Sequence, residues 1–102
     1  MSNAVCYISF NLREGASVDE FLLAAEKLNN EQVSKHKGYI SWKQLNDGDT
    51  WVDVLTFETM EDVKNFEANS AANPSELAKH FYSYINLSSC KVDYFSVVKS
   101  YE

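Results

Sequence analysis

The sequence predicts an α+β domain built from two successive strand-helix-strand units. Apolar and polar residues alternate in four short segments, which is the pattern of strands that bury one face. Two other segments carry apolar residues at helical spacing and begin at N-capping residues. The pair Asp47-Gly48 separates the second strand segment from the third and is a strong hairpin signal, because both turn residues must accept a positive φ.

The first unit starts with a strand over residues 4–12, followed by a helix that begins at Ser17. Ser17 and Glu20 have the spacing of a capping box, in which the serine hydroxyl accepts a hydrogen bond from a backbone N–H of the first turn. The apolar stripe of this helix consists of Val18, Phe21, Leu22, Ala25, Leu28 and Val33. We expect the helix to end within residues 34–37, because Gly38 is a typical stop signal.

The hairpin joins strands that are predicted over residues 39–45 and 50–58. If Asp47-Gly48 form a two-residue loop, Trp42 lies opposite Asp53. The face that carries these two side chains also holds Ile40, Gln44, Trp51, Leu55 and Phe57. The other face holds Tyr39, Ser41, Lys43, Leu45, Val52, Val54 and Thr56. A slip of one residue in the pairing would exchange the two faces.

The second helix is predicted to begin at Thr59, with Asp62 at the second position of the capping box. Its apolar stripe starts with Met60, Val63 and Phe66. The pattern weakens before Asn73 and Pro74, which suit an N-cap and a first helical position. We therefore expect a helix that is broken near Asn73-Pro74, with the apolar stripe continued by Leu77, Phe81 and Ile85.

A loop over residues 86–89 and a last strand over residues 91–99 complete a single domain of residues 1–102. The resulting order, β-α-β-β-α-β, is that of the ferredoxin-like fold with a four-stranded antiparallel sheet. Right-handed crossovers place both helices on one face of this sheet.

The face without helices carries more apolar residues than an antiparallel sheet normally shows to water. Its apolar members are Tyr39, Leu45, Val52 and Val54, joined by Val5 and Tyr7. A second copy of the chain, related by two-fold symmetry, is the simplest cover for such a face, so we predict a homodimer. The polar residues Ser9, Asn11, Ser41 and Lys43 on the same face would also tolerate solvent.

Charge and composition exclude several classes of partner. The net charge is −6 and the lysines are scattered, which disfavours binding to nucleic acid or to an anionic membrane. No apolar run has transmembrane length, and no signal peptide is recognisable, so we expect a cytoplasmic protein. The two cysteines, Cys6 and Cys90, form no ligand motif, and we expect no metal site.

The segment from Trp51 to Asp62, a strand that runs directly into a capped helix, is similar to the third strand and helix start of antibiotic-biosynthesis monooxygenase-like domains. These belong to the dimeric α+β barrel superfamily, and the order of elements resembles theirs over nearly the whole chain. The resemblance implies cofactor-free oxygenases, haem-degrading enzymes or isomerases. Haem use is not expected, because the positions that match the Trp and His of the haem-degrading branch look like Phe57 and Glu67.

The resemblance to the oxygenase branch implies an apolar substrate pocket between sheet and helices. Trp42, Trp51, Phe57 and Tyr84 are its candidate lining residues, and Asp53 is a candidate proton acceptor, because burial raises the pKa of a carboxyl. Alternatively, Asp53 accepts a hydrogen bond from the Trp42 indole or lies near the sheet edge in water.

His80 and Tyr84 are four residues apart on one helical face, a spacing that would suit an acid–base pair at a pocket mouth. Alternatively, His80 is a solvent-exposed residue at the border of the apolar stripe.

Two functions follow from these patterns. The first is a monooxygenase-like protein that acts on or binds a small aromatic or lipophilic molecule without metal or flavin. The alternative is a non-catalytic homodimeric module of the same fold, with a ligand-binding or stress-related role. A cavity beneath Trp42 that contains a polar group would favour the first, and side chains that fill this space would favour the second.

Overall fold

The computed structural model of the chain describes residues 2–101, so Met1 and Glu102 of the predicted domain lie outside the described residues. Four antiparallel strands form one sheet in the order β2-β3-β1-β4. Their bounds are β1 Ala4–Leu12, β2 Tyr39–Asn46, β3 Trp51–Phe57 and β4 Ile85–Ser96. The first strand of the chain therefore lies in the interior of the sheet, between β3 and β4.

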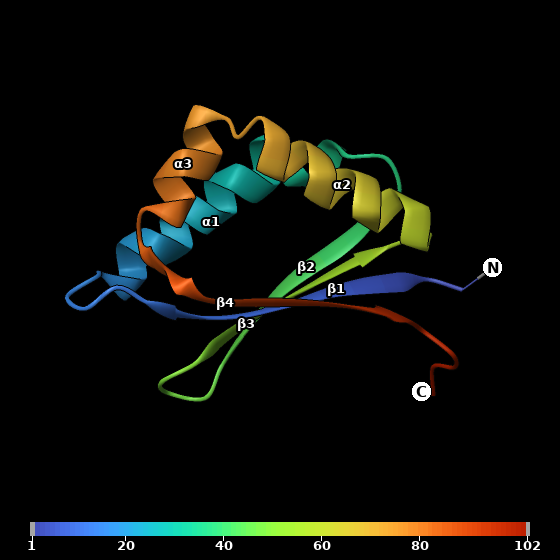
Figure 1. Cartoon of the computed structure of the whole chain (residues 1–102), viewed down its shortest axis with the longest axis horizontal. Coiled ribbons are helices and arrows are strands. Elements are labelled where there is room, and N and C mark those ends of the chain that lie inside the picture. The colour runs from blue at the N-terminus through green and yellow to red at the C-terminus, as the bar shows by residue number, and fades with distance from the viewer. Residues whose placement is uncertain (1, 102) are drawn as a thin grey trace.

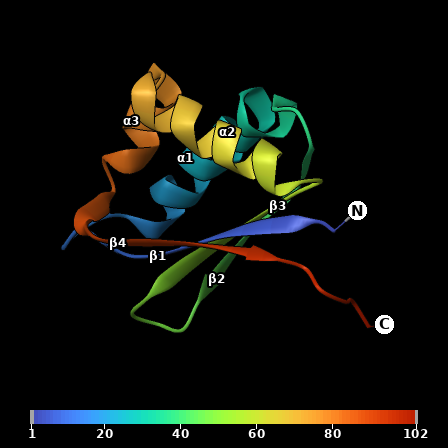
Figure 2. The same cartoon turned by 45° about the vertical axis from the view of Figure 1, so that its right-hand side comes forward.

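All helices lie on one face of the sheet (Figures 1 and 2). Their bounds are α1 Val18–Glu31, the short 3₁₀ helix η1 Val33–Lys35, α2 Met60–Ala72 and α3 Glu76–Tyr82. The predicted β-α-β-β-α-β order and the ferredoxin-like α+β fold are thus confirmed, including the break in the second helix. No helix within residues 2–101 is both long and apolar enough to cross a bilayer.

Both predicted helix starts are confirmed, but the second half of the broken helix begins later than expected. The hydroxyl of Ser17 accepts from the N–H of Glu20 at 3.2 Å, and that of Thr59 accepts from the N–H of Asp62 at 3.0 Å. Ser75, not Asn73, caps α3, while Asn73 ends α2. The Ser75 hydroxyl accepts from the N–H of Ala78, so Pro74 lies before the helix and not at its first position.

The hairpin between β2 and β3 is longer than the predicted two-residue loop. The Asp47 carboxylate accepts hydrogen bonds from the N–H groups of Asp49 and Thr50, at 3.0 and 2.8 Å, and so draws residues 47–50 into one turn. Gln44 therefore lies opposite Asp53, and Trp42 opposite Leu55. The register is shifted by two residues from the prediction, and an even shift leaves the predicted faces unchanged from Ser41 onward.

An irregularity at the start of β2 places two neighbouring side chains, those of Tyr39 and Ile40, on the opposite faces of the sheet to those predicted. The pairing with β3 shifts between Tyr39 and Ser41, which inserts one extra residue into β2. Tyr39 packs on the core, where its hydroxyl donates to Asn29 Oδ1 of α1 at 2.9 Å, so its predicted place on the helix-free face is wrong. Ile40 is 45% exposed, which corrects its predicted place on the helix-covered face.

Residues 86–89, predicted as a loop, belong to β4, which also ends at Ser96 and not at residue 99. The pairing steps from Ser9–Lys91 to Asn11–Asn86, so β4 carries three extra residues in an extended bulge. Inside the bulge the Ser89 hydroxyl accepts from the N–H of Asn11 at 2.8 Å and donates to the carbonyl of Asn86 at 2.6 Å. These side-chain bonds replace ladder bonds and keep a polar segment within the sheet.

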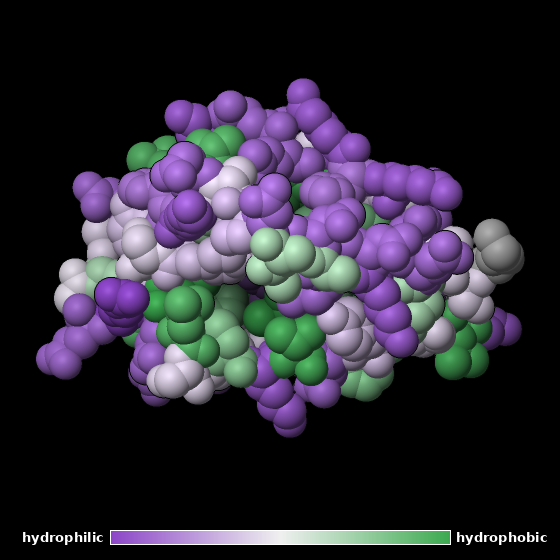
Figure 3. All heavy atoms as spheres, turned by 45° about the horizontal axis from the view of Figure 1, so that its top comes forward, coloured by the Kyte–Doolittle hydropathy of each residue, from purple (hydrophilic) through white to green (hydrophobic). Residues whose placement is uncertain are grey.

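The core lies between the sheet and the helices and is rich in aromatic rings. Phe21 of α1 is fully buried and lies at its centre, with its ring centroid 5.2 Å from those of Trp51 and Phe81 and 5.9 Å from that of Phe10. Figure 3 shows that the outer surface of the helix layer is mostly hydrophilic, with hydrophobic groups below it in that view. The helices are therefore amphipathic covers of a single apolar layer.

Candidate functional site

Asp53 is a carboxyl group inside the layer between sheet and helices. It lies on β3 with 4% of its surface exposed, and its Oδ1 accepts a hydrogen bond from Gln44 Nε2 at 3.2 Å. Burial raises its pKa to about 6, although Trp42 and Gln44 lower the pKa in part. Asp53 is thus mostly ionised at neutral pH and close to the pKa at which it can exchange a proton.

Trp42, on the neighbouring strand β2, supplies an N–H group near this carboxyl. The indole N–H is buried and makes no hydrogen bond of acceptable geometry within residues 2–101. It lies close enough to Asp53 to lower the pKa of that carboxyl, but the contact falls outside hydrogen-bond geometry. A buried donor without an acceptor is rare and is a natural partner for an oxygen atom of a ligand.

A second carboxyl, that of Glu67, comes from α2 and is half-buried, and burial raises its pKa. The pKa of Tyr82 is raised by burial and then by the charges of Glu67, Cys90 and Asp53. We call Asp53, Glu67 and Tyr82 the carboxylate cluster, because one phenol is within range of both carboxyl charges. Strands and helices that are remote in sequence thus bring three titratable groups to one side of the sheet.

Both cysteines also lie near the carboxylate cluster. Burial, followed by the charges of Glu67 and Asp53, raises the pKa of the Cys6 thiol to about 12. The pKa of Cys90 is raised by burial and by the same two carboxyls. Cys6 is buried, Cys90 is exposed and both are free thiols. A thiol with a raised pKa stays protonated and is a poor nucleophile, so the chemistry available here is proton transfer by carboxyls.

The sequence patterns pointed to Asp53 but not to Glu67 or Tyr82 as site residues. Glu67 follows Val63 by four residues on α2, which places it on the side of the helix that faces the core. Tyr82 follows the buried Phe81 at the last position of α3. Helical spacing could have found Glu67, whereas the place of Tyr82 depends on how α3 packs. No three His, Cys, Asp or Glu side chains in the described part of the chain are grouped closely enough to hold a metal ion.

His80 and Tyr84 do meet, as their spacing predicted. Tyr84 Oη lies 3.4 Å from His80 Nε2, and the two rings are 5.3 Å apart. The pair lines an open groove of about 550 Å³ between α1 and α3, together with residues such as Leu23 and Lys27. His80 is exposed there, whereas Asp53 is buried in the sheet, so these two candidate catalytic residues lie in different environments.

The remaining predicted site residues are parts of the aromatic core. Phe57 is fully buried against Phe66 of α2, with ring centroids 5.2 Å apart, and lies four residues beyond Asp53 on β3. That spacing corresponds to roughly 13 Å along a strand. Trp51 is half-buried against Phe21, and Trp42 packs edge-on against Phe81 at 5.6 Å. Of the predicted residues, Trp42 is therefore the one that touches both the core and Asp53.

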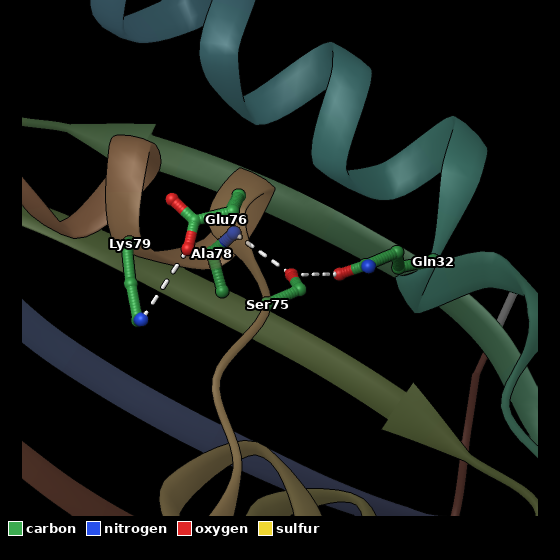
Figure 4. Close-up of polar contacts among 5 residues, drawn as sticks. All are labelled: Gln32, Ser75, Glu76, Ala78 and Lys79. Carbon is green, nitrogen blue, oxygen red and sulfur yellow. Dashed lines mark hydrogen bonds and ion pairs between the residues drawn. The ribbon is translucent and has the colours of Figure 1, made fainter.

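A cleft of about 580 Å³ opens where α1 and η1 face the break between α2 and α3. We call it the helix-break cleft. Its lining includes Phe66 and Tyr82, so Tyr82 belongs both to the cleft and to the carboxylate cluster. At its border the Ser75 hydroxyl donates to Gln32 Oε1 at 2.6 Å and joins α1 to α3 (Figure 4).

The fold is that of the antibiotic-biosynthesis monooxygenase-like proteins, as the sequence resemblance implied. The chain is similar to SnoaB, a cofactor-independent oxygenase from Streptomyces nogalater, with a TM-score of 0.72 and 10% identity over 98% of this chain and 97% of that one. It is also similar to a protein from Chloroflexus aurantiacus assigned to the antibiotic biosynthesis monooxygenases, with a TM-score of 0.67 and 15% identity over 99% and 98% of the two chains.

A third similar structure is a hydroxynitrile lyase from Passiflora edulis, with a TM-score of 0.61 and 21% identity over 97% of each chain. No family model and no curated protein matches the sequence. Identities this low establish a shared fold alone. Because an oxygenase and a lyase share this fold, the chemistry of a chain with this fold depends on its own side chains.

Proposed function

We propose that this chain is a monooxygenase-like protein of the cytoplasm, a single domain that acts on a small aromatic or lipophilic molecule without metal or flavin. The observation that carries the proposal is Asp53, a buried carboxyl with a pKa of about 6. The unpaired indole N–H of Trp42 lies beside it. A base next to a hydrogen-bond donor, inside an aromatic layer, suits removal of a proton from an aromatic substrate.

The reaction requires molecular oxygen as the oxidant and a substrate with an acidic C–H bond beside a ring carbonyl. Asp53 takes the proton, and the Trp42 N–H donates a hydrogen bond to the enolate oxygen that forms. The carbanion gives one electron to oxygen, and the two radicals combine into a hydroperoxide with a new C–O bond. The O–O bond then breaks with loss of water, which converts the methylene group into a carbonyl and balances one oxygen molecule against one substrate.

The direct test uses dithranol, a hydroxylated anthrone whose methylene group is acidic. We expect the protein to consume one oxygen molecule per dithranol, above the spontaneous rate, and to form the anthraquinone. Asp53→Asn should lower kcat by about 100-fold or more, because general-base catalysis typically contributes 10²–10⁴. Asp49→Asn removes an exposed carboxylate of the hairpin and should leave the rate unchanged. An unchanged rate in Asp53→Asn would return that residue to a structural role.

We also propose that the helix-free face of the sheet pairs with a second copy of the chain. Its apolar residues include Leu45, which is 49% exposed, and Phe95, which is 56% exposed. Phe95 packs edge-on against Tyr7 on the same face, at 6.4 Å. One similar structure, from an uncultured marine organism, is described as dimeric and ferredoxin-like. Wild-type protein should sediment as a dimer and Phe95→Lys as a monomer, while Leu23→Lys on the helix side should remain a dimer.

The second candidate function is a non-catalytic homodimeric module that binds a ligand or has a stress-related role. It is favoured by the dense packing of Phe21, Phe81 and Trp42, which occupy the layer beneath the helices. Ligand binding without any dithranol-dependent oxygen uptake in the wild type would support this alternative.

A further inference from the structure

The helix-break cleft is a concave site that the predicted residues did not include. Its volume of about 580 Å³ lies within the roughly 300–1,000 Å³ typical of sites for small molecules. It lies where the second crossover is split: α2 ends at Ala72, α3 starts at Glu76, and the residues between them, which include the only proline of the sequence, lie beside the end of α1, where Ser75 bonds Gln32.

The inner part of the cleft is apolar. Its lining residues of this kind are Leu28, Val33, Phe66, Pro74 and Ala78. Leu28, Val33, Phe66 and Ala78 are also members of the buried core, so the cleft reaches down to the aromatic layer. The rings of His36 and Phe66 pack in a T-shaped arrangement, with the centroids 4.9 Å apart. An occupant of this part must offer apolar, preferably planar, surface.

The rim, in contrast, is polar but nearly balanced in charge. Its uncharged hydrogen-bonding residues are Gln32, Asn69, Ser70, Asn73 and Ser75. One acidic and one basic side chain, Glu31 and Lys35, complete the lining besides His36. Such a rim provides no fixed counter-charge for an anion or a cation and suits a molecule with neutral hydrogen-bonding groups.

We propose that the helix-break cleft binds an uncharged amphipathic small molecule, with its apolar body on Phe66 and its polar groups at the amide and hydroxyl rim. Tyr82 is the phenol in its lining, and its ring packs on Phe81, with the centroids 5.6 Å apart. This binding does not rest on the proposed function.

Two adjacent alanines on the last turn of α2 allow a matched test. Ala71 and Ala72 are both exposed, but only Ala72 lines the cleft. Titration with Nile red, an uncharged amphipathic dye, should show one saturable site per chain in the wild type. Ala72→Trp should weaken this binding at least tenfold, and Ala71→Trp should leave it within twofold of wild type. The anionic dye 8-anilinonaphthalene-1-sulfonate should bind at least tenfold more weakly than Nile red.

The outcomes separate this inference from the proposed function. Non-saturable binding in the wild type, equal effects of the two tryptophans, or equal binding of both dyes would overturn the inference. If dithranol is not oxidised by any variant while Ala72→Trp still loses the dye, the proposed reaction fails and the binding site stands.

Discussion

The first connection crosses the sheet as one uninterrupted helix, α1, whereas the second is divided into α2 and α3 around Asn73–Ser75. The side of α1 that faces the sheet is anchored by Phe21, which has aromatic neighbours on two strands and on α3. The divided connection instead leaves a cleft and holds Glu67 and Tyr82 only half-buried. The continuous helix stabilises the fold through its buried ring, whereas the broken one leaves an open cleft beside it.

The largest expected effect on stability compares one buried phenylalanine from each connection, Phe21 of α1 and Phe66 of α2. Phe21→Ala should lower the free energy of unfolding by about 4 kcal/mol, because it removes a fully buried ring from a site that is enclosed on all sides. Phe66→Ala should cost about 1 kcal/mol less, because that ring borders the open cleft. Urea denaturation measures both values. An equal or larger loss in Phe66→Ala would mean that the two connections contribute alike.

The next effect concerns pH and the carboxylate cluster. The pKa of Asp53 is raised from 3.8 to about 6, so the folded state holds this proton more tightly than the unfolded state. The proton bound to Asp53 therefore stabilises the folded state fully below pH 4, and this stabilisation is lost as the pH rises through about 6. The free energy of unfolding should fall by about 3 kcal/mol over this range. Asp53→Asn should gain that amount over the wild type between pH 4 and pH 7.5 in urea unfolding.

The same titration should appear in catalysis with the opposite sign. If Asp53 acts as a base, dithranol turnover rises with pH through an apparent pKa near 6, because only the carboxylate accepts a proton. Stability and rate would then change in opposite directions across the same pH range. A rate profile without a transition near pH 6 would separate the buried carboxyl from the reaction.

A smaller effect compares the two serine caps. Ser17→Ala removes one capping bond from α1 and should cost about 1 kcal/mol. Ser75→Ala removes the cap of α3 and also the bond to Gln32 across the cleft, so we expect a cost of about 2 kcal/mol. Thermal unfolding measures the difference. Equal costs would show that the bond across the cleft contributes nothing to stability.

The smallest expected effect is a control on the same short helix. Lys79 and Glu76 form an ion pair at 3.4 Å, with side chains that are 59% and 92% exposed (Figure 4). Lys79→Ala should change the free energy of unfolding by less than about 0.5 kcal/mol, because solvent screens such pairs. A larger loss in the same urea titration would indicate that α3 depends on its surface charges and not on Ser75.

Much of the fold follows from local sequence. The caps at Ser17 and Thr59, and the faces of the hairpin strands from Ser41 onward, depend on neighbours within a few residues, so local patterns could predict them. The hairpin register and the bulge of β4 could not be predicted in this way. They are decided by side-chain bonds to the backbone, from Asp47 in the turn and from Ser89 to the distant Asn11.

In the candidate site, too, local patterns could predict some residues, whereas the positions of others depend on tertiary packing. Asp53 could be predicted because strand alternation alone puts it on the covered face. Glu67 and Tyr82, whose pKa is raised by burial and by the charges of both carboxyls, come from different helices, and their positions depend on the packing of α2 and α3. His80 and Tyr84 meet through local helical spacing alone, and His80 is exposed, which is the alternative that the sequence offered for it.

The interior place of β1 has a consequence for how this chain is made. During synthesis β1 emerges before both of its partners, β3 on one side and β4 on the other. One edge of β1 therefore has no native partner until residues 85–96 have been made. The sheet is complete only after β4 has emerged, and a truncation before Ile85 would leave β1 as an exposed edge that pairs with other copies.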